Sequence, residues 1–337
     1  MQTPVIHQTD LFHPYNDPDD HFDLACQYAL SKNGDIDLRG VLIDYSVNPS
    51  FGDPSLFAVQ QLNYITGKAV PIGIGLNAPL KDREGLLAAL HAEKGLSGAR
   101  MVLDILMRSK EQVAIHIVGS CRDIAAAAAM DPGLFREKCK GVYLSAGSYE
   151  YNGRLEYNVW VDPFSYSLMF GLPCPLYWLP CVRVMTEPPF QTGTYCSHYG
   201  FVQAEILPHL SPAMQNYFLY ALTRTSDIKW LTYLDHPVNE KLLRFFSQQY
   251  RNMWTTAGIL HAAGKTVLLS GDLNDLGGDT EKEAYRFVPI SVSCSEQGLT
   301  AWEENPASSD RFILKIKDAD AYPAAMTKAM KTLLCTL

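Results

Sequence analysis

The sequence lacks the features of several common protein classes. Its 337 residues carry a net charge of −8 and contain no run of lysine and arginine, which argues against a nucleic acid or an anionic membrane as the main partner. No apolar run approaches the roughly 20 residues that a membrane helix requires. The eight cysteines include no Cys-x-x-Cys pair, so we expect no zinc or dithiol redox centre and mostly buried, reduced thiols.

Signals for export and for common nucleotide sites are also missing. The N-terminal residues show no basic segment followed by an apolar one, and we expect a cytoplasmic protein. No Gly-rich nucleotide fingerprint or serine nucleophile elbow follows an apolar strand. The hydrophobic content of 47% is nevertheless sufficient for a large core.

Apolar strand-like segments alternate with helical patterns through the first half of the chain. We expect helices over residues 21–32, 55–66, 82–94, 99–110 and 122–130. This alternation predicts an α/β fold with a mostly parallel sheet covered on both faces, formed by one domain over residues 1–337.

The second half of the chain loses this rhythm. Residues 183–250 are expected to place helices and long loops over the carboxyl ends of the strands. A helix over residues 253–263 and a polar loop over 271–284 should follow. Residues 286–294 and 311–318 then have the pattern of an antiparallel pair before a final helix.

Residues 5–23, VIHQTDLFHPYNDPDDHFD, form the most informative stretch. Asp10 should end the first strand, and ligands of open α/β sheets bind beyond such ends. The four acids Asp10, Asp17, Asp19 and Asp20, which fall within eleven residues, could therefore hold a hard cation. Helix capping is the alternative. Asp17 suits an N-cap, Pro18 suits the first helical position, and acids favour the positive end of the helix dipole.

Two other chemistries share parts of this pattern. Residues 19–23, DDHFD, have the form DDxxD, by which prenyl synthases bind magnesium and diphosphate. That chemistry uses an all-helical fold, and the strand-rich pattern argues against it. A phosphoryl-transfer aspartate of the DxDxT type is excluded because Leu11 and Phe12 follow Asp10.

Four segments in the same order resemble one known family. Residues 9–20 resemble the Asp-rich loop DTDPGxDDA with a longer loop, and residues 117–125, IVGSCRDIA, are similar to GPLTNxA. Residues 142–147, VYLSAG, resemble IVLMGG, and residues 155–163, LEYNVWVDP, are similar to AEFNxxxDP. The chain therefore resembles the inosine-uridine-preferring nucleoside hydrolases. The resemblance implies hydrolysis of the N-glycosidic bond of a ribonucleoside or related N-riboside, as in purine and pyrimidine salvage.

The resemblance implies a metal site with Ca²⁺ as the cation and Mg²⁺ as the alternative. Asp10 would bind the metal and act as general base for the attacking water. Asp20 would be a metal ligand, Asp19 would lie at the metal and the ribose diol, and Val118 would contribute its backbone carbonyl. A small nucleoside is the implied partner, and the family commonly forms homo-oligomers.

The resemblance also implies the substrate-binding residues. Glu156 and Asn158 would bind ribose hydroxyls, and Asn152 would bind the primary hydroxyl of the sugar. Trp254 would stack on the leaving base if it faces the cleft. Other residues near the motifs are expected to be structural: Asp162 as a helix N-cap, and His116, Tyr157, Trp160 and Trp178 in the core.

One departure from the family pattern leaves two functions open. The family's late His-Asp motif is matched best by Trp254-Thr255, and a hydroxyl cannot replace the charge of a carboxylate on Ca²⁺. Asp235 is a weak substitute, and Gly52-Asp53 replaces the family's Gly-Asn. The alternative to an enzyme is therefore a catalytically impaired nucleoside- or sugar-binding protein on the same fold.

Overall fold

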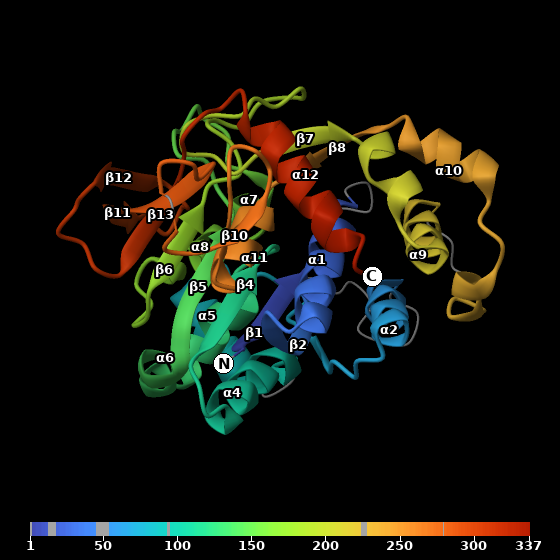
Figure 1. Ribbon diagram of the computed structural model, residues 1–337. Helices are drawn as coiled ribbons and strands as arrows, with labels where there is room; N and C mark the ends of the chain where they lie inside the picture. Colours follow the sequence, from blue (N-terminus) through green and yellow to red (C-terminus); the bar gives the residue numbers. More distant parts are fainter. Residues whose placement is uncertain (1, 13–17, 45–53, 93–94, 224–227, 279) are drawn as a thin grey trace.

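A nine-stranded sheet runs through the centre of the computed structural model, which describes residues 2–12, 18–44, 54–92, 95–223, 228–278 and 280–337 (Figure 1). Its strand order is β12-β11-β13-β6-β5-β4-β1-β2-β3. These strands are β1 (Thr3–Thr9), β2 (Ile36–Ile43), β3 (Ile72–Ile74), β4 (Val113–Ile117), β5 (Cys139–Ser145), β6 (Leu176–Leu179), β11 (Tyr285–Cys294), β12 (Thr300–Glu304) and β13 (Arg311–Ile316).

Neighbouring strands from β13 through β3 are parallel, whereas β11 pairs antiparallel with both β12 and β13. The predicted α/β class and mostly parallel sheet are therefore confirmed. The predicted C-terminal antiparallel pair is also present, and its strand β13 joins the main sheet beside β6. Strand β12 is an addition that the sequence pattern did not predict.

Helices cover both faces of this sheet (Figure 1). Successive side chains of a strand point to opposite faces; Val5 accordingly belongs to a core shared with α1, α11 and α12, and Ile6 to a core shared with α4, α5 and α8. The helices are α1 (Asp19–Asn33), α2 (Pro54–Thr66), α3 (Arg83–Ala92), α4 (Ser97–Arg108), α5 (Arg122–Met130), α6 (Pro132–Lys138), α7 (Tyr157–Val161), α8 (Pro163–Met169), α9 (Pro212–Leu222), α10 (Glu240–Ser247), α11 (Thr256–Ala262) and α12 (Tyr322–Leu334).

The chain reverses its direction of travel across the sheet between β1 and β4. It builds β2 and β3 on one side of β1 and then returns to place β4 on the other side. Crevices outside the carboxyl ends of strands at such a reversal are the usual ligand sites of open α/β sheets. The fold therefore favours a site formed by the residues that follow β1 and β4.

Two small antiparallel pairs correct the prediction for the second half of the chain. Strand β7 (Tyr199–Val202) pairs with β8 (Tyr250–Met253), and β9 (Lys265–Val267) pairs with β10 (Leu273–Asp275). Met253 is therefore a strand residue, and the helix expected from residue 253 begins at Thr256. The segment predicted as a loop at 271–284 contains β10.

The start of α1 also differs from the capping prediction. The helix begins at Asp19, and the N-cap position is taken by Pro18, which makes no side-chain capping bond. Asp17, His13, Gly52 and Asp53 lie outside the described residues. Within the described part of the chain, no helix combines the length and apolar character needed to cross a bilayer.

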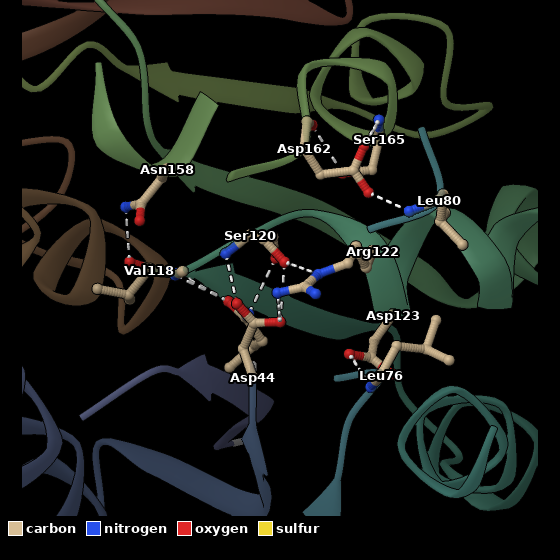
Figure 2. Close-up of polar contacts among 12 residues, drawn as sticks. Asp44, Leu76, Leu80, Val118, Ser120, Arg122, Asp123, Asn158, Asp162 and Ser165 are labelled. Atoms are coloured by element: carbon tan, nitrogen blue, oxygen red, sulfur yellow. Dashed lines mark hydrogen bonds and ion pairs between the residues drawn. The ribbon is translucent and has the colours of Figure 1, made fainter. Parts of the chain in front are cut away.

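Two buried carboxylates hold loops against the sheet (Figure 2). Asp162 caps α8, as predicted, by accepting from the backbone amide of Ser165. Its other oxygen accepts from the backbone amide of Leu80 at 2.6 Å. Asp123 at the start of α5 accepts from the amide of Leu76 through both oxygens, each at 3.1 Å. These carboxylates fix segments that are distant in sequence.

Substituting Asp162 tests how much its hydrogen bond with the Leu80 amide adds to the free energy of unfolding. Asp162→Ala removes the cap and leaves the Leu80 amide without its acceptor, so we expect a loss of about 2–4 kcal/mol in the free energy of unfolding. Asp131 caps α6 from an exposed position by the same Asp-Pro arrangement. Asp131→Ala should cost only about 1 kcal/mol in urea unfolding. Equal losses in the two variants would contradict the role of Leu80.

The pKa of Asp123 predicts a pH-dependent stability. Burial, aided by the charge of Asp44, raises this pKa to about 7. A carboxyl whose folded pKa is raised favours the folded state when protonated, so stability is lost as pH rises from the unfolded pKa to about 7. Asp123→Asn removes this loss and retains an oxygen for Leu76.

We expect Asp123→Asn to stabilise the protein more at pH 8 than at pH 5, by at least about 1 kcal/mol in urea unfolding. Asp104→Asn, on the exposed side of α4, is the control for loss of a carboxylate. A stability difference for Asp123→Asn that is the same at both pH values would show that Asp123 is ionised throughout.

Candidate active site

A cavity of about 230 Å³ lies at the reversal point between β1 and β4. Seven of the residues predicted from the sequence line it: Asp10, Asp19, Asp20, Val118, Glu156, Asn158 and Trp254. The lining is completed by residues that the sequence argument did not assign to ligand binding: Ser145, Tyr157, Cys181, Val182, Met185, Phe190 and Thr255. The cavity therefore joins four separate motifs in one place.

Asn152 is the predicted site residue that does not line this cavity. Its side chain is exposed, and its amide donates to the backbone oxygen of Met185 at 2.9 Å. Asn152 therefore contacts a residue of the cavity lining, Met185, without lining the cavity itself.

Asp20 connects the end of β1 to the start of α1. One of its oxygens accepts from the Thr9 hydroxyl at 2.5 Å and from the Leu11 amide at 3.2 Å. Leu11 has a φ of +37°, which is unusual for a residue with a side chain and is the kind of strain that gathers at functional sites. The strained backbone of Leu11 thus accompanies the hydrogen bond that holds Asp20 next to the end of β1.

This arrangement concentrates negative charge. Asp10 and Asp20 are 8% and 5% exposed. Burial raises the pKa of Asp10 well above its usual range, and the charges of Asp20 and Asp44 raise it further. A cation bound among these groups would oppose all three effects and favour the ionised carboxylates.

The turn after β4 packs tightly against these acids. A side chain at Gly119 would place its Cβ 2.5 Å from Asp44 Oδ2 and 3.2 Å from Asp10 Cβ, so only glycine fits. Gln8 accepts from the amides of Val118 and Gly119 and donates to the oxygen of Ser120. The position of the Val118 carbonyl is therefore fixed from β1.

A buried ion pair lies beneath this turn (Figure 2). Asp44, at the end of β2, accepts from the amide and the hydroxyl of Ser120 at 2.5 and 2.9 Å. Arg122 is fully buried, donates to the same hydroxyl at 2.6 Å, and lies 3.7 Å from Asp44. The guanidinium partly compensates the acids that surround Asp10.

Glu156 and Asn158 position the opposite wall of the cavity. Glu156 is the N-cap of α7, and its carboxylate accepts from the amides of Gly147, Asn158 and Val159. Burial raises the pKa of Glu156, and the hydrogen bonds donated by these backbone amides lower it. The Asn158 side chain donates to the Val118 carbonyl at 2.9 Å (Figure 2), so this predicted sugar-binding residue also supports the turn after β4.

The donors present fit a hard divalent cation. Asp19, Asp20 and Asp23 are buried, and one oxygen from each lies within 4.8 Å of the others. Ca²⁺ and Mg²⁺ prefer such oxygen ligands. Thr255 lines the same cavity, and its buried hydroxyl has no hydrogen-bond partner among the described residues. A buried polar atom of this kind usually has a partner, which a ligand in the cavity would supply.

Apolar and aromatic side chains form the remaining wall. Trp254 lies edge-to-face with Phe190, their ring centroids 5.8 Å apart, and Met185 and Val182 extend this surface. The lining of the cavity therefore combines buried acids with aromatic and apolar side chains. Such a lining suits a small molecule with a polyhydroxylated part and a flat part.

Expectations for the other aromatic residues have mixed outcomes. Trp178 and His116 are buried as predicted. Tyr157 lines the cavity, and Trp160 is 66% exposed, so the prediction that both belong to the core was wrong. The periodicity of the sequence could not predict the exposure of Tyr157 and Trp160, because α7 is only five residues long.

Comparison with known proteins agrees with this architecture. The profile of the inosine-uridine preferring nucleoside hydrolases matches residues 15–309. A purine-preferring ribonucleoside hydrolase from Gardnerella vaginalis is similar in structure, with 13% identity, 99% of each chain covered and a TM-score of 0.53. A plant nucleoside hydrolase gives 14% identity, 98% and 99% coverage, and a TM-score of 0.54.

A third similar structure is the type III effector protein XopQ complexed with adenosine diphosphate ribose, with 13% identity, 99% and 95% coverage, and a TM-score of 0.56. A search of curated proteins finds no match. At these identities the structural likeness shows the fold alone, whereas the family profile covers most of the chain. The chain therefore belongs to the inosine-uridine preferring nucleoside hydrolase family.

Proposed function

We propose that the protein hydrolyses the N-glycosidic bond of a ribonucleoside or related N-riboside to a free base and a sugar, with a divalent cation, Ca²⁺ in preference to Mg²⁺. The lining of the cavity supports this proposal, because it combines Asp10, Asp19 and Asp20 with the aromatic side chains of Phe190 and Trp254. Carboxylates suit the hydroxyls of a ribose, and aromatic side chains suit a flat base.

The cation would be held by Asp10, Asp19, Asp20 and the backbone carbonyl of Val118. When bound, it would supply positive charge that favours ionisation of a nearby water and orients the sugar hydroxyls. The requirement for a cation follows from the charge of the site, since four buried acids, Asp10, Asp19, Asp20 and Glu156, line one small cavity.

The side chains perform the remaining tasks. Asp10 accepts the proton of the attacking water as general base. Asp19 accepts hydrogen bonds from the ribose diol, and Asn158 and Glu156 hold sugar hydroxyls. Their negative and dipolar groups favour the positive charge that develops on the sugar as the base departs. Trp254 stacks on the leaving base.

A binding protein on the same fold is the second candidate. The observation that favours it is the pair Trp254-Thr255, which lines the cavity and is the best match in the sequence to the family's His-Asp motif. One similar structure is an effector protein complexed with adenosine diphosphate ribose. Under this alternative the protein retains ligand binding and lacks turnover.

Turnover measurements distinguish the two candidates. We expect the protein with Ca²⁺ to hydrolyse p-nitrophenyl riboside or a member of a nucleoside panel, and Asp10→Asn to lower kcat by about 10²–10⁴-fold because the general base is lost. Asp37→Asn, on the exposed part of β2, is the matched control and should retain activity. Saturable binding of nucleosides without turnover of any substrate would establish the binding-protein alternative.

Metal binding is tested separately by calorimetric titration of EDTA-treated protein. We expect uptake of Ca²⁺ that Asp20→Ala abolishes, because this change removes charge from the centre of the acidic cluster. Mg²⁺ should bind more weakly. The exposed helix cap Asp131→Ala should leave the titration unchanged. Wild-type protein that binds neither cation would show that the metal assignment is wrong.

A further inference from the structure

A third acid of α1 lies outside the motif that defines the family resemblance. The matched motif ends one residue after Asp19-Asp20, whereas Asp23 is one helical turn further along. Residues three and four apart share a helix face, so Asp23 follows Asp20 and Asp19 on the same side of α1. The side chain of Asp23 is fully buried, and one of its oxygens lies within 4.8 Å of oxygens from both other acids.

Thr255 gives an independent indication of a ligand at this place. It is 2% exposed, lines the cavity together with Asp19 and Asp20, and its Oγ1 has no hydrogen-bond partner among the described residues. An uncompensated buried hydroxyl is costly unless a ligand completes it. In the matched family pattern this position carries a carboxylate.

Asp23 and the segment around Thr255 are in direct contact. The Thr256 hydroxyl donates to Asp23 Oδ1 at 3.4 Å and lies 2.8 Å from the Tyr199 hydroxyl. Strand β8, which pairs with β7, and helix α11 both pack against α1. The carboxylate of Asp23 therefore lies beside Thr256, the residue that follows Thr255.

We propose that Asp23 supplies to the cation site the carboxylate that is replaced by Thr255. The affinity of a calcium site depends on the number of charged ligands, so the loss of an acid at 255 requires another one nearby. Asp23 provides it from α1, and the Thr255 hydroxyl contributes a neutral oxygen. This inference rests on the proposed function, because it concerns the cation of the same site.

A purely structural Asp23, which accepts from Thr256 and binds no cation, would give different results. Thr256→Val removes that hydrogen bond and keeps the carboxylate, whereas Asp23→Asn keeps an acceptor oxygen and removes the charge. Calorimetry with Ca²⁺ and Trp-sensitised Tb³⁺ luminescence measure cation binding without any assay of turnover. The full-length protein is used throughout, and near-ultraviolet circular dichroism checks its folding.

We expect Asp23→Asn to weaken Ca²⁺ binding about tenfold or more and Thr256→Val to change it less than about threefold. Adding Thr255→Asp to Asp23→Asn should restore most of the affinity, because the charge returns to the position where the family carries it. If Asp23→Asn does not fold, Asp23→Glu, which displaces the carboxylate by one methylene, should also weaken binding measurably.

The outcomes separate this inference from the proposed function. Full Ca²⁺ affinity in a folded Asp23→Asn or Asp23→Glu variant, together with its loss in Asp20→Ala, would overturn the role of Asp23 and leave the proposed metal site intact. Equal weakening by Thr256→Val and Asp23→Asn would show that Asp23 is a structural partner only. Wild-type protein that binds no cation would overturn both proposals.

Discussion

The crowding of buried carboxylates at the carboxyl ends of β1 and β2 constrains the rest of the site. Asp10, Asp20 and Asp44 are close enough for their charges to raise the pKa of Asp10. Repulsion of this kind requires compensation in a low-dielectric interior. Arg122 supplies part of it through Asp44 and Ser120, and a divalent cation would supply the rest.

The strand order brings these buried carboxylates together with the other residues that line the cavity. Because β1 lies between β2 and β4, the acid that follows β1 meets Asp44 from one side and the Val118 turn from the other. The antiparallel β7–β8 pair then brings Trp254 and Thr255 to the same cavity. The lining thus combines acids that follow β1 or begin α1 with aromatic side chains from the chain beyond β6.

Much of the fold follows from the sequence because its signals are local. The apolar strands and the helices α2, α4 and α5 match their expected positions within a few residues. The predictions that failed concern β8, β10 and β12, which are short strands stabilised by a partner distant in sequence or by a turn. Their periodicity is too brief to distinguish them from a helix start or a loop.

For the candidate site, the sequence by itself determined which residues are candidates: the acids at Asp10, Asp19 and Asp20, and the segment with Glu156 and Asn158. Only the tertiary structure decided that these residues line one cavity, that Asn152 contacts Met185 without lining it, and that Asp23 accepts from Thr256, next to Thr255. The physical reason is that residue types and spacing are local properties, whereas the distance between charges depends on strand order and on helix packing.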